Sequence, residues 1–143
     1  MAKADDPLRL LAEDGEDLAV ISAALQDAVI KLGDIRYEAA ARRLTLAVNR
    51  FRWESGGRAR ERVRAGVQFG GVLAVKARKL RRDAPGAVVE LLDVAFEPGD
   101  APGGTVALTF AGGGDLRLEV ECVDVILSDV SQAWPARGLP EHD

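Results

Sequence analysis

The stretch FAGGGDLRLEVECVD, residues 110–124, decides how the chain is expected to fold. Leu116, Leu118 and Val120 alternate with charged residues, which is the period of a strand with one buried face. The glycines before this strand separate it from a second alternating run at 106–110 and predict a hairpin turn. Two strands joined this closely indicate an antiparallel sheet.

Cys122 is the only cysteine and has the same parity as Val120, so we expect it on the core face as a small apolar residue. A catalytic thiol needs a histidine or a cation beside it, and the single histidine, His142, is next to the C-terminus. One cysteine also excludes an internal disulfide and a cysteine-rich zinc site.

The composition is that of a soluble globular domain, with 143 residues, 48% hydrophobic and 29% charged. We expect one domain over 1–143, ordered from about 8 to 131, with tails at 1–7 and 132–143. No apolar run approaches the roughly 18 residues of a membrane span, and the acidic N-terminus lacks a signal-peptide pattern. The expected location is the cytoplasm, with no membrane partner.

The charges are segregated along the sequence. Between Arg36 and Arg82 there are 14 Lys and Arg against three acids, and the rest of the chain is acidic. Such a segment can bind a polyanion. The alternative is that strands pair in space and bring the acidic and basic segments together, which stabilises a sheet.

One amphipathic helix is expected over about 16–32. Asp14 and Asp17 form an acidic variant of the capping box, and negative charge in the first turn favours the helix. Apolar residues recur at helical spacing up to Leu32, and Gly33 supplies a left-handed stop.

The remainder of the chain is predicted to form strands. Residues 8–12 indicate a short strand or an extended lead-in, and 35–37 with 44–48 predict a hairpin. A change of parity at Phe51 and Trp53 predicts a bulge near Asn49–Arg50. The other expected strands lie at 63–69, 72–78, 88–96, 106–110 and 116–122. A mobile loop is expected at 54–62.

The predicted fold class is therefore α+β. One N-terminal amphipathic helix packs on a curved, mainly antiparallel sheet or partly open barrel of six to seven strands.

Four segments together resemble a known family: EDLAVISAALQDAV at 16–29, RRLTLAVNRFRWE at 42–54, AFEPGD at 95–100 and FAGGGDLRLEVECVDVILSDVSQAW at 110–134. They are similar to the bacterial family catalogued as domain of unknown function 2948. The resemblance extends from about Leu8 to the end of the chain. It implies a stand-alone cytoplasmic domain and carries over no activity, cofactor or catalytic residue.

The segment NRFRWE, residues 49–54, is the richest local constellation. Arginines beside aromatic side chains on a sheet can bind phosphate and stack bases. On this interpretation the polar residues of the segment face one side, and Phe51 with Trp53 faces the other. The candidate binding surface comprises Asn49, Arg50, Arg52, Trp53, Arg60, Arg62, Arg64 and Arg78. The alternative is a core strand whose arginines pair with Glu90, Glu119 or Glu121.

No catalytic, cofactor-binding or metal-binding residues are predicted. The glycine runs at 103–104 and 112–114 open no helix and carry no P-loop lysine. Glu119 and Glu121 lack further ligands for a cation, and the serines lack a histidine partner.

Three functions remain open. The first is a non-catalytic module that binds itself, as a homo-oligomer, or another protein. It would use a sheet edge or the acidic helix face with Glu13, Asp14, Glu16 and Asp17. The second is a nucleic-acid-binding accessory protein that uses the basic segment 36–82. The third is a small-molecule site in the mouth of the curved sheet, lined by Trp53, Tyr37 and Arg50.

Overall fold

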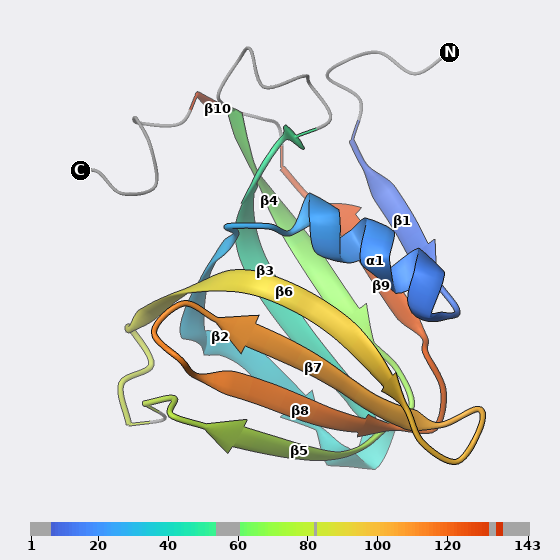
Figure 1. The fold of residues 1–143 in the computed structure, drawn as a ribbon. Helices are drawn as coiled ribbons and strands as arrows, with labels where there is room; N and C mark the ends of the chain where they lie inside the picture. Colours follow the sequence, from blue (N-terminus) through green and yellow to red (C-terminus); the bar gives the residue numbers. More distant parts are fainter. Residues whose placement is uncertain (1–6, 54–60, 82, 132–133, 136–143) are drawn as a thin grey trace, which may run out of the picture.

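The structure is a computed structural model that describes residues 7–53, 61–81, 83–131 and 134–135. These residues form a curled sheet with one α-helix (Figure 1). The elements are β1 (Arg9–Ala12), α1 (Gly15–Ala24), β2 (Val29–Glu38), the 3-10 turn η1 (Ala39–Ala41), β3 (Arg43–Phe51), β4 (Glu61–Phe69), β5 (Val72–Arg78), β6 (Val88–Pro98), β7 (Gly104–Phe110), β8 (Asp115–Val120), β9 (Val125–Asp129) and β10 (Trp134–Pro135).

The strand order is β1-β9-β4-β3-β2-β6-β7-β8-β5, and β10 also pairs with β4. All of the pairings found among the described residues are antiparallel. The predicted antiparallel sheet with one helix is confirmed. The predicted count of six to seven strands is wrong, because the short strands β1, β9 and β10 add to it, and α1 follows β1 instead of opening the fold.

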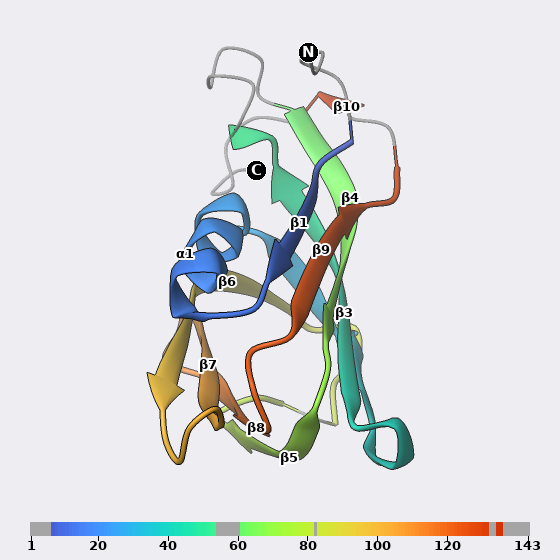
Figure 2. The ribbon, with the colours of Figure 1, turned by 90° about the vertical axis from the view of Figure 1, so that its right-hand side faces the viewer.

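The sheet curls without closing, so that its two halves face each other. Figure 2 shows β1, β9, β4 and β3 in one layer, with β6, β7, β8 and β5 turned across from it. Helix α1 covers the opening between β1 and β6. None of the described helices is long and apolar enough to cross a membrane.

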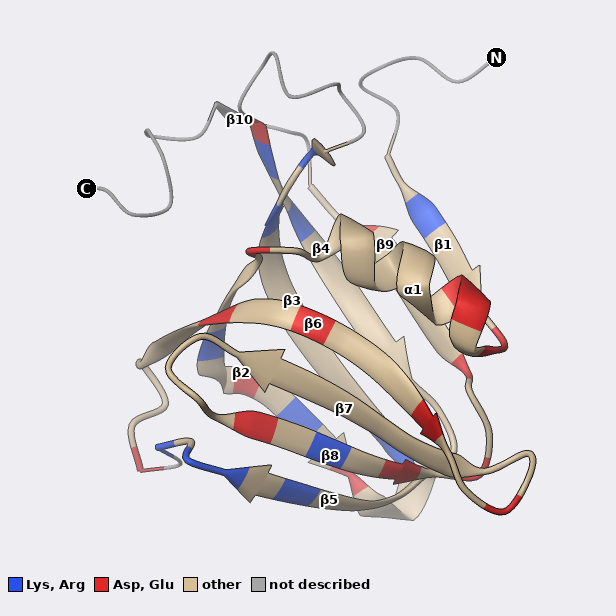
Figure 3. Ribbon diagram, viewed as in Figure 1, with Lys and Arg blue, Asp and Glu red and all other residues tan. Residues whose placement is uncertain are grey.

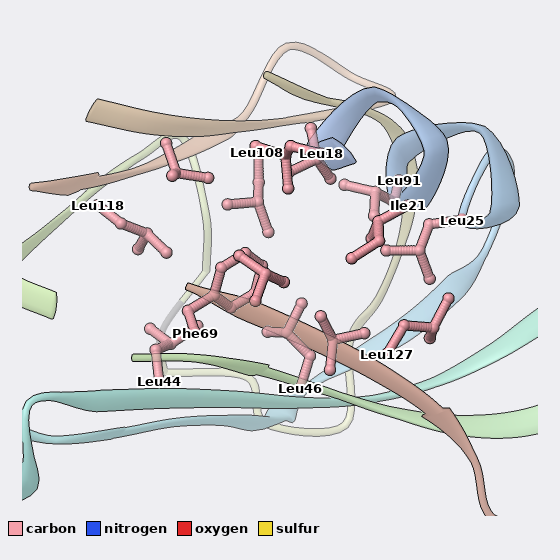
Figure 4. Packing of buried hydrophobic residues seen from close by; sticks show 14 of the residues in the cluster. Leu18, Ile21, Leu25, Leu44, Leu46, Phe69, Leu91, Leu108, Leu118 and Leu127 are labelled. Atoms are coloured by element: carbon pink, nitrogen blue, oxygen red, sulfur yellow. The ribbon is translucent and has the colours of Figure 1, made fainter. Parts of the chain in front are cut away.

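The core lies between the two halves and the helix. Leu18, Ile21 and Leu25 of α1 are fully buried. Figure 4 shows Phe69 between Leu44 and Leu46 of one half and Leu108 and Leu118 of the other. Burying such a side chain contributes about 1.5–3 kcal/mol, so this apolar contact holds the halves together.

Helix α1 begins as predicted and ends early. The backbone N–H of Asp17 donates to Asp14 Oδ1 at 2.8 Å, and that of Glu13 donates to Asp17 Oδ2 at 3.1 Å. The expected continuation to Leu32 is wrong, because Asp27 is left-handed at φ 64° and its N–H donates to Leu91 O. The β-branched residues that follow, Val29 and Ile30, pair with β6. An apolar residue of this strand, Leu32, also falls at helical spacing from the helix, which is why the helix was predicted to continue.

Strand β3 is regular where a bulge was predicted. Its pairing with β4 runs without a shift from Leu44↔Phe69 to Phe51↔Arg62. The parity therefore does not change at Asn49. Arg50 lies on the same buried face as Leu44 and the alternate residues after it. The predicted bulge is wrong because Arg50, although charged, lies on the buried face of the strand.

The hairpin between β7 and β8 is confirmed. Gly112 and Gly113 occupy φ of 92° and 96°, which other residues rarely adopt. Strand β8 ends at Val120, however, and the chain bends away from the sheet. Cys122 is only partly buried, so its prediction as a core residue is wrong, and Val123 enters the core instead.

Two further expectations concern the ends and a loop. Trp134–Pro135, expected in a tail, pair with Glu61 and Arg62 of β4. Most of the predicted mobile loop, residues 54–60, and of the tails, 1–6, 132–133 and 136–143, lies outside the described residues.

The partial exposure of Cys122 predicts that a thiol reagent labels the folded protein at neutral pH without denaturant. A matched control is Val120→Cys in a Cys122→Ser background, because Val120 is 3% exposed. That thiol should react only in denaturant. Labelling of the wild-type protein that also requires denaturant would contradict the placement of Cys122.

Candidate functional site: a slit between two strand edges

Three of the predicted binding residues come together on the outer face of β3 and β4. Arg62 Nη1 donates to Asn49 O and Arg64 Nη1 donates to Asn49 Oδ1, both at 3.1 Å. Arg64 also pairs with Asp34 Oδ2 on β2 at 3.2 Å. The guanidinium of Arg62 lies 4.1 Å from the centroid of the Phe51 ring, a cation–π contact.

Arg50 and Arg52 are buried and do not share this face. Arg50 makes a bidentate ion pair with Asp129 on β9, with Nε–Oδ1 at 2.9 Å and Nη2–Oδ2 at 2.8 Å. The side chains of this pair are 0% and 1% exposed. Arg52 Nη1 donates to Glu61 Oε1 at 2.6 Å. The expectation that Asn49 and Arg50 face one side is wrong, because adjacent residues of a regular strand point to opposite faces.

The remaining predicted residues are dispersed. Trp53 is partly exposed, and its Nε1 donates to Gln26 O at 3.1 Å. Arg78 lies on β5, where it pairs with Asp115 at 2.6 Å. Arg60 lies outside the described residues. The structure therefore does not unite the eight residues in one surface.

The acidic and basic segments are brought together by the fold. Seven described arginines of the basic segment lie in ion pairs with acids: Arg42, Arg43, Arg50, Arg52, Arg64, Arg78 and Arg81. Figure 3 shows acidic and basic residues interleaved over neighbouring strands of the sheet. This arrangement supports the interpretation in which pairing across strands neutralises the segment.

Two carboxyl groups lie near Arg62 at one end of the sheet. Burial raises the pKa of Glu90, and its interaction with Asp27 raises that pKa further. Arg62 acts in the opposite direction on Glu90, while burial lowers the pKa of Arg62 itself. The charge of Glu90 is therefore unfavourable in the folded protein.

A cavity of about 410 Å³, partly open to solvent, lies between β2 and β5. We call it the slit. Its lining residues come from both strands, from β3 and β8 behind them, and from the loop after β5. They are Leu32, Gly33, Ile35, Tyr37, Leu44, Val75, Ala77, Leu80, Pro85 and Leu116. Hydrocarbon forms most of the wall, since among the described lining residues only Tyr37 has a side chain with a polar group.

Both ends of the slit are closed by hydrogen bonds. At one end Tyr37 Oη donates to Val72 O at 3.0 Å, and Val72 N donates to Arg42 O at 2.8 Å. At the other end Gly33 N donates to Pro85 O at 2.8 Å. An ideal Cβ on Gly33 would lie 3.0 Å from that oxygen, so only glycine permits this approach without a shift. These hydrogen bonds join the two sides of the slit at its ends.

A second hollow, of about 460 Å³, lies between α1 and β6. Its lining includes Ser22, Gln26 and Asp93, and the first and last of these form a hydrogen bond of 3.2 Å. Polar groups form a larger share of its lining than of the slit's. In the described part of the chain, no group of three or more His, Cys, Asp or Glu could hold a metal ion.

The sequence-based reasoning named Tyr37 for a pocket and missed the other lining residues. The other two residues named for that pocket, Trp53 and Arg50, do not line the slit. The sequence pattern places Ile35 and Val75 in expected strands and says nothing of a pocket between them. Alternation reports which residues face inward and does not report whether a strand opposes them.

These features define a small protein built from a curled antiparallel sheet, with an apolar slit where two strand edges fail to pair. The chain belongs to the family described as Protein of unknown function (DUF2948), which matches residues 8–142. No curated protein and no solved structure matches it significantly.

The buried ion pair makes a prediction about stability. Arg50→Met leaves the Asp129 carboxylate buried without this partner, and should lower the free energy of unfolding by about 3–5 kcal/mol in urea titrations. The double variant Arg50→Met/Asp129→Leu should recover much of that loss. Arg43→Met is the control, since it breaks an exposed pair worth under about 1 kcal/mol. Equal losses in the two single variants would refute the role of burial.

The raised pKa of Glu90 gives a prediction about pH. Protonation is favoured in the folded state, so the stabilising contribution is present at low pH and lost as pH rises through the folded pKa. Glu90→Gln mimics the protonated form and should increase the free energy of unfolding at pH 7. The difference from wild type should shrink towards pH 4. A decrease at pH 7 would contradict this sign.

Proposed function

We propose that this chain is a non-catalytic ligand-binding protein that takes an elongated apolar molecule into the slit. The observation that carries the proposal is the cavity of about 410 Å³ between β2 and β5 with its hydrocarbon wall. Ligand pockets are typically about 300–1,000 Å³, mostly apolar and formed in advance.

The lining of the slit, rather than its volume, distinguishes it from the second hollow. Protein interiors contain few voids larger than one water molecule, which occupies about 30 Å³ of liquid. A space more than ten times that volume would be filled by water against leucine, isoleucine and valine side chains. Replacing this water by hydrocarbon supplies a driving force of about 0.8 kcal/mol for each methylene group buried.

Self-association and binding of another protein stay predictions. Strands β1 and β5 end the sheet, and Leu11 of β1 is 56% exposed. Nucleic-acid binding by the segment 36–82 also stays a prediction, with less support because many of its arginines already have acidic partners.

The proposal is tested with a neutral fluorescent apolar probe, Nile red, added to the full chain. We expect saturable binding that Ala77→Phe abolishes, because residue 77 lines the slit. The control is Val20→Phe, which places the same ring on the exposed surface of α1, where Val20 is 56% exposed. Both variants need thermal unfolding curves close to that of wild type.

Failure of the folded wild-type protein to bind the probe would overturn the proposal. Equal binding by Ala77→Phe and Val20→Phe would also overturn it, since the probe would then lie elsewhere. Light scattering on the same samples shows whether bound protein changes its oligomeric state.

A further inference from the structure

Each of the two strands that border the slit carries a basic residue between two lining residues. On β2, Arg36 lies between the lining residues Ile35 and Tyr37. On β5, Lys76 lies between the lining residues Val75 and Ala77. Successive side chains of a strand point to opposite faces, so these two point outward where their neighbours point into the slit. Both are exposed, and we refer to these two outward residues as the lips of the slit.

The acids on the same strands have partners elsewhere. Asp34 is paired with Arg64, and Glu38 is paired with Arg43. Asp115, on β8 beside β5, is paired with Arg78.

Lys76 shares the outer face of β5 with Arg117 and Glu119, and Arg117 is itself paired with Glu97. Within the described residues, neither Arg36 nor Lys76 takes part in an ion pair. The two lips therefore carry positive charge that no ion pair of the described residues neutralises, with Glu119 as the one acid on the face of Lys76 that is also outside these pairs.

From this arrangement we infer that the ligand is a single-chain anionic amphiphile, such as an alkyl carboxylate. Its chain lies in the slit and its head group lies at the mouth between Arg36 and Lys76. The inference deepens the proposed function and rests on it. A head group in this position stays hydrated, so binding removes no charge from water, while the chain leaves water completely.

The closed ends of the slit favour this occupant over a peptide. A partner strand that added to the free edge of β5 or β2 would have to continue past Val72 or Pro85, where hydrogen bonds already join the two sides. A flexible chain can enter from the mouth and needs no passage through either end.

The test measures displacement of Nile red by dodecanoate, below its micelle concentration, and by dodecan-1-ol, below its solubility limit. The two share an alkyl chain and differ in head-group charge. We expect dodecanoate to bind more tightly, with an advantage that shrinks at high salt. Arg36→Gln/Lys76→Gln should weaken dodecanoate binding about five- to tenfold and leave dodecan-1-ol unchanged. Arg9→Gln, an exposed basic residue on β1, is the control and should change neither.

Failure of the inference can be separated from failure of the proposed function. If dodecan-1-ol binds as tightly as dodecanoate and the double variant changes nothing, the head-group inference is overturned and the slit remains a binding site. If neither compound displaces the probe and the probe itself does not bind, the proposed function fails. Sedimentation with phosphatidylglycerol vesicles, combined with no binding of soluble dodecanoate, would overturn the single-chain ligand in favour of a membrane surface.

Discussion

Strand β2 is paired on both edges only near its start, and the shape of the molecule depends on this. Val29 and Ile30 pair with both β3 and β6. The register with β3 then shifts before Ile35, and the strand leaves β6. The first part of β2 joins the two halves of the sheet, whereas its second part belongs to one half alone. The curl of the sheet, the core between the halves and the slit beside β5 all follow from this divergence.

The charged residues also find their partners only in the folded chain. Arg50 and Asp129 are 79 residues apart and form the buried pair that links β3 to β9 across β4. Arg42 and Glu121 are equally far apart and pair on the surface at 2.7 Å. The two contacts differ in energy, because an exposed pair is screened by water and a buried carboxylate depends on its partner. Segregation along the sequence thus becomes alternation across the sheet.

Much of the fold could be predicted from local patterns. The capping residues of α1 and the glycines of the β7–β8 turn act through neighbours in the sequence, so both were found. The end of α1 could not be found in this way, because Asp27 leaves the helix to pair with Leu91, 64 positions further along. Arg50 was assigned to the wrong face for a similar reason, since only Asp129 makes a buried guanidinium acceptable there.

The candidate site was the least predictable part of the molecule. The alternation of Ile35 and Tyr37 with Arg36 indicated that the first two share a face, but a residue on an inward face can oppose a packed strand or an empty space. The difference depends on whether β5 meets β2, which is decided by Tyr37 Oη, Gly33 and the loop that carries Pro85. None of these contacts has a signature in its own segment.

Arg36 and Lys76 lie on unpaired strand edges, so they affect strand pairing as well as ligand binding. A free strand edge invites another chain to pair with it, and charged residues on such an edge discourage that pairing. Arg36 and Lys76 would therefore keep a strand from a second copy out of the slit while they attract an anionic head group. An occupant without backbone hydrogen-bonding groups meets only the attraction. The same two side chains that make the edges poor partners for protein thus select for an alkyl chain with a negative end.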